Sequence, residues 1–383
     1  VKPLWDAGKQ LAIRAHWDRT IYTTINADTS APTLIGFETG VNATLRPYLR
    51  TKPVVGNAPT IDLIRYIRGF PVSGWRDRDL TIDGILRTWK LGDIVFSDPV
   101  VVPAPKERYD VIYNDQSYAE FYSRWAKRRN VVYVGSNDGM LHAFNGGFNI
   151  SNTKQVMQAS EAQIQFCEAL NADATSCVVD PTKPLGKELW AFIPYDVLPH
   201  LAWLADPDYQ HVYYVDHMSR MTDARIFTPD ADHVNGWGTI LVIGLRLGGG
   251  EIDVTDTFGG VLQTKQFKSA YYALDVTNPD VPPRLLWRFT APELGFSLSV
   301  PTFVREEDSG QDYWYMVVGS GPTNYRGGRA VDATISNTKF TMNGVAGLSG
   351  MSSILPHLYI VDLRTGKPDS TWTAHATSGG VKG

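Results

Sequence analysis

The sequence predicts an all-β protein, and three features of its 383 residues carry that prediction. Glycine (34 residues) and proline (23) are more frequent than in an average globular chain, and both residue types favour turns. Aromatic residues make up 11% of the chain and charged residues only 20%, and aromatic rings pack well on pleated sheets. Beyond Gly92, short runs of β-forming residues alternate with Gly, Pro, Asn and Asp, which is typical of a sandwich, a barrel or a propeller.

Residues 1–90 differ from the rest of the chain in their residue pattern. We expect them to be a mixed lead-in segment that packs on a β domain formed by 91–383. The stretches 4–15 and 61–70 place apolar residues three and four positions apart, as one face of a short helix does. A β-like stretch, YTTIN, and a segment rich in Pro and Thr lie between them. This segment is therefore predicted to contain both helices and strands.

The strands of residues 91–383 group into three similar units of about four strands each. A unit has a leading strand with Pro or small residues, a strand that ends in Gly, a strand with Asp or Asn before a turn, and a strand that contains Trp. The units comprise 93–102, 130–145 and 187–194; then 211–227, 237–250, 269–278 and 284–290; then 295–305, 313–322, 357–367 and 370–372. Four antiparallel strands per repeat predict the blade of a β-propeller.

Trp190, Trp287 and Trp372 each lie in the last strand of a unit, and we expect them to fill equivalent structural places between blades. The alternative is that three aromatic residues near strand ends are ordinary core residues. Because propellers have about four to eight blades, three units do not close a ring. The chain also ends where a new leading strand would begin, so we expect a partial propeller, incomplete or truncated in this chain, with an open edge.

Three insertions interrupt the predicted propeller, at 103–129, 149–186 and 323–355. The first contains a predicted amphipathic helix at 117–129. The second contains both cysteines of the chain, Cys167 and Cys177, which either form a disulfide around a loop of about ten residues or remain idle thiols. The third, rich in Gly, Ser, Asn and Thr, is either a flexible flap or a variable insertion without a function. Insertions on a rigid fold are a common place for binding sites.

The charge balance argues against a nucleic-acid partner. Lys and Arg number 36 against 40 Asp and Glu, a net charge of −4, so the sequence predicts no basic surface for a polyanion. No stretch reaches the roughly 18 uninterrupted apolar residues of a membrane-spanning helix, so we predict no transmembrane segment. The sequence starts at Val1 without a basic and apolar leader, so a secretion signal is either absent or already removed.

The nearest approach to a cation site is the segment DADHVNG, in which Asp230, Asp232 and Asn235 are weak candidate ligands. The segment lacks the closing bidentate acid of a strong calcium loop, so the alternative is a solvated turn. The eight histidines form no zinc or haem-attachment spacing, and the glycine-rich stretch 244–250 lacks the Lys-Ser/Thr ending of a phosphate loop. We therefore predict that the protein is not an enzyme.

Several blocks of the sequence resemble the PilY/PilC family of proteins, which are associated with the tips of type IV pili. The stretch 113–145, YNDQSYAEFYSRWAKRRNVVYVGSNDGMLHAFN, is similar to the hallmark stretch of that family. The stretch 187–201, KELWAFIPYDVLPHL, is similar to its next block, and further matches follow in order along nearly the whole chain. The resemblance implies the C-terminal propeller-like domain of a large secreted protein whose N-terminal half lies outside this sequence.

The resemblance also implies a function. Members of the family help pili to extend by opposing retraction, sit with minor pilins at the pilus tip, and promote adhesion to abiotic surfaces or host cells. It implies an extracellular location, at the pilus tip or the outer membrane surface, after passage through the periplasm, and secretion favours the Cys167–Cys177 disulfide. Calcium is implied too, but the family's acidic loop DxDxDxxxD does not occur before Gly383, so its ligands are not assigned to residues of this chain.

Two other interpretations stay open from the sequence. One is a secreted propeller scaffold that binds a peptide or a glycan. The other is a quinone-dependent dehydrogenase propeller, whose blade repeats the stretch 133–144 resembles. Those enzymes carry adjacent cysteines and a calcium-bound quinone at the disc centre, whereas Cys167 and Cys177 are ten positions apart.

Overall fold

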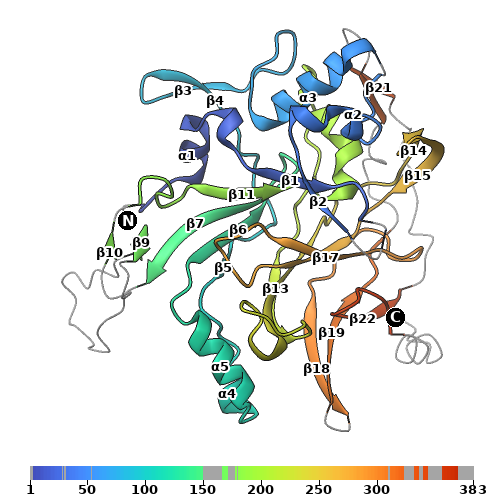
Figure 1. The fold of residues 1–383 in the computed structure, drawn as a ribbon. Helices are drawn as coiled ribbons and strands as arrows, with labels where there is room; N and C mark the ends of the chain where they lie inside the picture. Colours follow the sequence, from blue (N-terminus) through green and yellow to red (C-terminus); the bar gives the residue numbers. More distant parts are fainter. Residues whose placement is uncertain are drawn as a thin grey trace.

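Strands make up most of the regular structure, and they form several small, mostly antiparallel sheets with no closed barrel among the described residues (Figure 1). The computed structural model describes residues 3–27, 29, 32–52, 54–149, 166–170, 177–178, 180–308, 311–322, 332–335, 340–343 and 356–369. The prediction of an all-β protein is confirmed in part, because the described ranges are mostly β and also contain short helices. The arrangement of the sheets as propeller blades stays a prediction.

The first sheet contains the strands of the first predicted unit. Its strand order is β2-β1-β11-β7-β6-β5, with β8 (Phe166–Cys167) paired to β7. An antiparallel meander, here called the first meander, runs through β5 (Val100–Val102), β6 (Asn130–Gly135), β7 (Leu141–Asn149) and β11 (Glu188–Phe192).

The lead-in segment contributes two more strands to this sheet. β1 (Ile21–Thr24) pairs parallel with β11, and β2 (Leu34–Gly36) pairs antiparallel with β1. The two predicted helices of the segment correspond to α1 (Ala7–Ile13) and α3 (Ala58–Arg68). Residues 1–90 therefore share a sheet with the first meander.

The rest of the lead-in segment consists of short elements. The hairpin of β3 (Asp79–Ile82) and β4 (Ile85–Thr88) stands apart from the sheets in Figure 1. The helical turns are η1 (His16–Asp18), η2 (Thr39–Val41), α2 (Asn42–Leu45) and η3 (Val55–Asn57).

The second predicted unit forms a four-stranded antiparallel sheet, here called the second meander. Its strands, in spatial and chain order, are β12 (Arg220–Arg225), β13 (Trp237–Gly244), β16 (Tyr271–Asp275) and β17 (Arg284–Phe289). A hairpin of β14 (Ile252–Phe258) and β15 (Val261–Phe267) lies between β13 and β16 in the chain. Its two-residue turn, Gly259–Gly260, has positive φ at both positions, as a type I′ turn requires.

The third predicted unit forms a three-stranded antiparallel sheet, here called the third meander. It consists of β18 (Thr302–Asp308), β19 (Gln311–Gly319) and β22 (Leu358–Asp362). The predicted fourth strand, 370–372, lies outside the described residues.

The second meander separates two hydrophobic cores. Leu241 and Ile243 of β13 belong to the core shared with the first meander and the lead-in segment. Ile240 and Val242 of the same strand belong to the core shared with the third meander. This assignment follows the alternation of side chains along a strand, and Figure 1 shows β13 between the other two sheets.

The predicted insertions contain mostly short elements. In 103–129 lie α4 (Tyr109–Ile112) and α5 (Gln116–Trp125), and the Asp115 carboxylate caps α5 by accepting backbone N–H bonds. The described parts of 149–186 and 323–355 include β8 (Phe166–Cys167), β9 (Ala169–Leu170), β10 (Cys177–Val178), β20 (Asp332–Ile335) and β21 (Phe340–Asn343). Two further helical turns are the fully buried η4 (Tyr195–Ala205) and the short η5 (Val234–Gly236).

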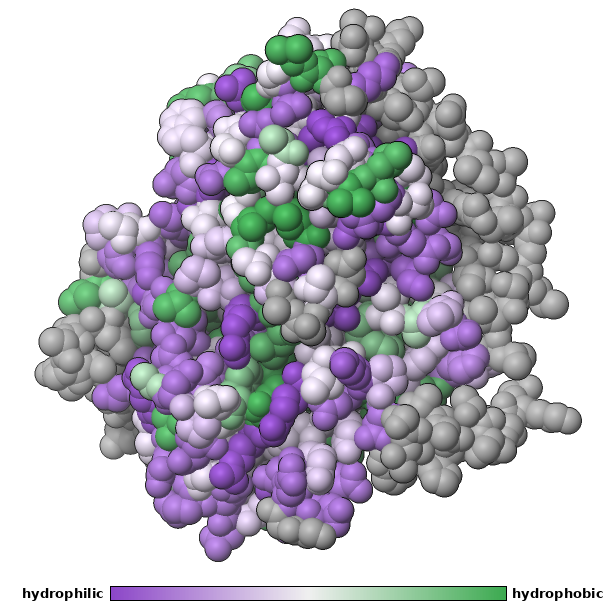
Figure 2. Space-filling view, turned by 45° about the vertical axis from the view of Figure 1, so that its right-hand side comes forward, coloured by the Kyte–Doolittle hydropathy of each residue, from purple (hydrophilic) through white to green (hydrophobic). Residues whose placement is uncertain are grey.

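Exposed apolar side chains are spread over different elements. Examples are Leu86 on β4, Ile112 in α4 and Leu262 on β15. On the face shown in Figure 2, hydrophobic residues form separate islands among hydrophilic ones. Scattered exposure of this kind is ordinary for a globular surface. In the described ranges, no helix is both long enough and apolar enough to cross a membrane.

Candidate functional site

Two of the three tryptophans singled out in the sequence occupy matching positions in the first and second meanders. Trp190 of β11 pairs with Ala143, and Trp287 of β17 pairs with Ala273. In both sheets the strand register shifts beside this pair, as a β-bulge does. Both indoles are buried. Trp372 lies outside the described residues, so a match in the third meander stays a prediction.

The two indoles differ in their surroundings. The Trp287 Nε1–H donates a 2.8 Å hydrogen bond to the carbonyl of Leu363, directly after β22. It therefore joins the second meander to the third. Trp190 packs against Tyr133 of β6, with ring centroids 5.5 Å apart, and so contacts its own sheet.

A buried ionic cluster joins the lead-in segment to the first meander. The Arg19 guanidinium donates two hydrogen bonds to the Glu188 carboxylate, at 2.8 and 2.9 Å. Glu188 Oε1 also lies 2.8 Å from His142 Nδ1, and His142 Nε2 lies 3.0 Å from Asp138 Oδ2. The side chains of Arg19, His142 and Glu188 are inaccessible to solvent. A buried charge is tolerated only when it is paired in this way.

Electrostatics in this cluster keep all four side chains ionised. Burial alone would lower the pKa of His142, but the carboxylates of Asp138 and Glu188 outweigh burial and raise it to about 9. Burial would raise the pKa of Glu188, but Arg19 and His142 lower it well below its usual range. The histidine is therefore protonated at neutral pH and acts as a structural cation.

A second buried ion pair lies between η4 and the second meander. The Arg288 guanidinium donates to both carboxylate oxygens of Asp196, at 2.5 and 2.7 Å. Tyr272 also donates its hydroxyl to this carboxylate, and the backbone N–H of Lys268 donates to it at 3.0 Å. Asp196 is fully buried. The first cluster therefore ties the lead-in segment to the first meander, and the second ties η4 to the second meander.

The three weak candidates for a cation site have separate partners. The Asp230 carboxylate accepts hydrogen bonds from the backbone and ring of His233. The Asp232 carboxylate accepts from Asn278 Nδ2, and Asn235 Nδ2 donates to Glu120.

His233 also bonds to Asp275 on its other ring nitrogen, which fixes the turn against β16. Within the described ranges, no group of three or more His, Cys, Asp or Glu side chains is placed to hold a metal ion. The candidate ligands Asp230, Asp232 and Asn235 stay a prediction.

The predicted disulfide falls outside what the structure describes. The backbone places Cys167 at the end of β8 and Cys177 at the start of β10. The side chains of both cysteines lie outside the described residues, so their pairing stays a prediction.

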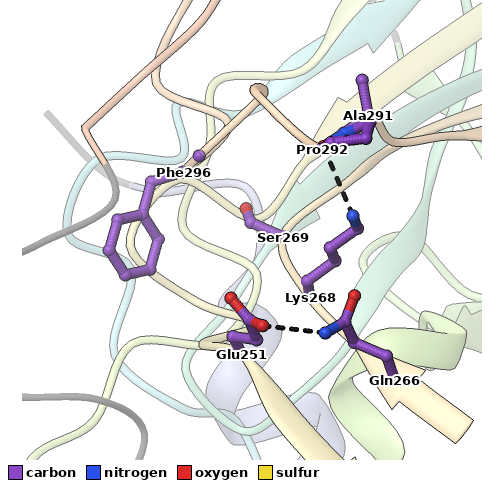
Figure 3. Close-up of a pocket in the computed structure, with 9 residues that line it drawn as sticks. Glu251, Gln266, Lys268, Ser269, Ala291, Pro292 and Phe296 are labelled. Carbon is purple, nitrogen blue, oxygen red and sulfur yellow. Dashed lines mark hydrogen bonds between the residues drawn. The ribbon is translucent and has the colours of Figure 1, made fainter. Parts of the chain in front are cut away.

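A pocket of about 280 Å³ opens beside the junction of the second and third meanders (Figure 3). One wall comes from the two ends of the β14–β15 hairpin and includes Glu251, Gln266 and Lys268; the other comes from 291–296. Gly249, in the glycine-rich stretch that we singled out in the sequence, lines the pocket with φ at +62°. Only glycine adopts this backbone conformation at no steric cost.

The polar groups of this pocket already bond to one another. Gln266 Nε2 donates to Glu251 Oε1 at 2.8 Å, and Lys268 Nζ donates to the carbonyl of Ala291 at 3.4 Å (Figure 3). The Ser269 hydroxyl is 2.9 Å from that of Ser297. Among the described residues, these polar groups of the pocket therefore pair within the protein.

The sequence interpretation missed both ionic clusters. A signal was present, because each cluster places a charged residue within an apolar strand or turn. Glu188 lies in KELWAFIP, His142 in GMLHAFN and Asp196 in FIPYDVLPHL. Charged residues are rarely fully buried unless they are paired, so each of these residues implied a partner. Their partners Arg19 and Arg288 are far away in sequence and carry no local signal.

The comparison with curated proteins finds relatives of this chain. No family model matches the chain. The type IV pilus biogenesis factor PilY1 homolog of Xylella fastidiosa (strain Temecula1 / ATCC 700964) is 31% identical over 323 residues, which cover 78% of this chain and 20% of that protein. The type IV pilus biogenesis factor PilY1 of Pseudomonas aeruginosa (strain UCBPP-PA14) is 30% identical over 332 residues, which cover 83% of this chain and 22% of that protein.

Among solved structures, the crystal structure of the Pseudomonas aeruginosa PilY1 C-terminal domain is similar to 70% of this chain and 36% of that chain, with 23% identity and a TM-score of 0.36. The chain spans about a fifth of the length of the curated relatives named above. Identity near 30% over most of the chain, to relatives that share one name, agrees with the family expected from the sequence blocks. This chain therefore belongs to the PilY family of type IV pilus biogenesis factors.

Proposed function

We propose that this chain is a non-catalytic part of a type IV pilus biogenesis factor that helps pili to extend by opposing their retraction. One observation carries the proposal, namely the 31% identity over 78% of the chain to a relative named as such a factor. We further propose that the protein acts outside the cell, at the pilus tip or the outer membrane surface, beside minor pilins.

The geometry supports a rigid platform. The second meander shares one core with the first meander and another with the third, so the sheets cannot move independently without opening a core. Two buried ion pairs and the Trp287 bond to Leu363 add directional contacts between elements. We propose that the three meanders are neighbouring blades of a β-propeller, with the tryptophans in equivalent positions. A stiff support of this kind suits a protein that must resist the pulling force of retraction.

We propose that the platform carries out no reaction. In the described residues, the buried Asp196 is bonded by Arg288 and the Lys268 backbone N–H, and the buried Glu188 by Arg19 and His142, which leaves neither free for proton transfer. A dehydrogenase of the quinone-dependent class would reduce a dye in the presence of quinone and calcium. We expect no dye reduction by the purified chain above a heat-denatured control, and turnover of the dye would contradict the proposal.

We propose that adhesion to host cells or abiotic surfaces is a second role, carried by the insertions 149–186 and 323–355. Insertions that project from a rigid fold are common binding elements, which supports this choice. We propose calcium as a ligand of the complete protein only through the family resemblance, without ligands assigned to this chain.

Removing the codons for residues 1–383 from the native gene tests the main proposal. We expect surface pili, measured in sheared fractions, to disappear together with twitching motility. If the protein opposes retraction, deletion of the retraction ATPase in the same strain restores the pili. Unchanged piliation, or pili that stay absent without the retraction ATPase, would contradict this role. Attachment assays in the strain without retraction then test adhesion at equal pilus number.

A further inference from the structure

A second cavity, of about 370 Å³, lies beside the β3–β4 hairpin, between the lead-in segment and the first meander. We call it the lead-in cavity. Its charged lining residues are Arg76, Arg78, Lys90, Asp77, Asp79, Asp93 and Asp138. The kind of ligand that this cavity can bind depends on which of these charged side chains already have partners in the protein.

The four carboxylates of the lead-in cavity already accept hydrogen bonds from the protein. The donors are His142 Nε2 to Asp138 (3.0 Å), Asn137 Nδ2 and His211 Nε2 to Asp93 (2.8 Å each), Thr88 Oγ1 to Asp79 (2.6 Å) and the Asp79 backbone N–H to Asp77 (2.8 Å). Asp138 faces the protonated His142, so its negative charge is compensated within the protein.

The three cations contact aromatic rings and backbone carbonyls. The Arg76 guanidinium lies 3.9 Å from the centre of the Tyr209 ring, and that of Arg78 lies 3.8 Å from the centre of the Tyr66 ring. The side chain of Lys90 is nearly buried, and its Nζ donates only to two backbone carbonyls, each at 3.2 Å. In the described part of the chain, none of the three forms an ion pair with a carboxylate.

Arg78 and Lys90 add evidence that this cavity favours an anion. Arg78 Nε is buried without a hydrogen-bond partner among the described residues. Burial, together with the nearby cations Arg19, Arg78 and Arg87, lowers the pKa of Lys90 to about 8. Cations crowded together in this way destabilise one another, and an anion placed between them would relieve that repulsion.

We propose that the lead-in cavity binds the carboxylate of an organic acid, with Lys90, Arg76 and Arg78 as its cationic contacts. The planar forks of two arginines match the two oxygens of a carboxylate. The cavity is within the size range of small-molecule sites, and its apolar walls, Trp89 and Leu204 among them, suit the carbon stem of the acid. This site is independent of the pilus role and would exist whether or not that role is correct.

Titration calorimetry with the full chain at pH 7 tests the site. The probes are glutarate, the neutral analogue glutaramide, and inorganic phosphate. We expect glutarate to bind saturably, glutaramide not to bind, and phosphate to bind at least fivefold more weakly because it lacks a carbon stem. Absence of saturable glutarate binding would overturn the proposal. Binding of phosphate as tight as that of glutarate would overturn its restriction to organic acids.

Three variants test whether glutarate binds at the cations of the lead-in cavity. Arg76→Gln removes a cation that is only half-buried, and Lys90→Met removes the buried cation but keeps its stem. The control is Arg124→Gln, because the Arg124 guanidinium also lies over an aromatic ring, that of Trp125 at 4.6 Å, but does not line the cavity. We expect glutarate affinity to fall about fivefold for Arg76→Gln, at least tenfold for Lys90→Met, and not at all for Arg124→Gln. If Lys90→Met does not fold, Arg76→Gln alone decides.

The carboxylate can come from a free acid or from the end of a protein chain. Two peptides distinguish these sources, one ending in glutamate with a free terminus and one with the same sequence and an amidated terminus. Tighter binding of the free-ended peptide than of glutarate points to a protein ligand, and the reverse order points to a free acid. Equal glutarate affinity of wild type, Arg76→Gln and Lys90→Met would place the binding elsewhere and overturn the assignment.

Discussion

The indole Nε1–H of Trp287 donates a 2.8 Å hydrogen bond to the carbonyl of Leu363, and this bond links the last strand of the second meander to the turn after β22. The same turn contains Gly366, whose φ of +69° lies in the left-handed region. A Cβ at this glycine would lie 2.4 Å from Cγ of Trp287, closer than any real contact. The two sheets therefore approach this closely only because residue 366 has no side chain beside the Trp287 indole.

The variant Gly366→Ala is predicted to destabilise the protein by about 3 kcal/mol, because left-handed strain adds to a clash that the buried indole cannot avoid. The matched control is Gly259→Ala at the tip of the β14–β15 hairpin. There φ is +57°, but an added Cβ meets no atom within 4 Å. The control isolates the strain, for which we expect a loss of about 1 kcal/mol. Urea denaturation of both variants measures the two losses in free energy of unfolding. Equal losses would contradict this account of the contact between Gly366 and Trp287.

The two matching tryptophans are predicted to respond differently to phenylalanine. Trp287→Phe leaves the Leu363 carbonyl without its donor in a buried place, which adds about 1 to 3 kcal/mol to the cost of the smaller ring. Trp190→Phe removes only ring volume and keeps the aromatic contact with Tyr133, so we expect a loss of about 1 kcal/mol. Guanidinium denaturation compares the variants. A loss in Trp190→Phe as large as in Trp287→Phe would show that the hydrogen bond contributes little.

The sequence was sufficient to predict which strands belong to each meander. Turn residues separate the strands, and neighbouring strands in the chain pair in space, as in β12, β13, β16 and β17. It also predicted the positions of α1, α3 and α5, because their apolar residues recur at helical spacing. The hairpin of β14 and β15 went unrecognised, although a Gly-Gly turn lies between two alternating runs there.

Contacts between distant segments could not be predicted from local patterns. The parallel pairing of β1 with β11 joins segments about 170 residues apart, as does the Arg19 bond to Glu188. A single arginine in a mixed lead-in segment has many candidate partners, and only the fold selects one of them. For the same reason, the cations of the lead-in cavity gave no motif, since Arg76, Arg78 and Lys90 meet only after β3 and β4 turn back on themselves.

The His142 imidazolium predicts a loss of stability at alkaline pH. Its folded-state pKa is raised to about 9 from an ordinary value of 6.5. A raised pKa contributes stability that is fully present below pH 6.5 and is lost as the pH rises through about 9. The loss is on the order of 3 kcal/mol for a fully buried group. Urea midpoints measured from pH 6 to 10 check this slope.

The His142→Gln variant is the control for this titration. Glutamine fills a similar space and can bond to Asp138 or Glu188, but it does not ionise in this range. Other groups that titrate here, such as Lys90 with its pKa of about 8, are common to both proteins and cancel in the difference. We expect the variant to be less stable at pH 6 and to converge with the wild type near pH 10. Parallel curves would show that His142 is neutral in the folded protein.

The Arg19–Glu188 pair is predicted to be the strongest electrostatic link between the lead-in segment and the first meander. Arg19→Met leaves Glu188 buried beside His142 with one cation too few, and removing one partner of a buried pair typically costs about 3 to 5 kcal/mol. The matched control is Lys9→Met, which breaks the solvent-exposed Lys9–Asp83 pair and is expected to cost at most about 1 kcal/mol.

Adding Glu188→Gln to Arg19→Met distinguishes an ionic link from lost packing. If the uncompensated charge causes the instability, removing that charge recovers part of the loss, and the two substitutions are not additive. If packing of the Arg19 stem causes it, the double variant is at least as unstable as the single one. We expect recovery, measured by urea denaturation at pH 7, together with earlier proteolytic cleavage of the lead-in segment in Arg19→Met than in Lys9→Met. Cleavage at equal rates would mean that other contacts, such as the β1–β11 pairing, hold this segment in place.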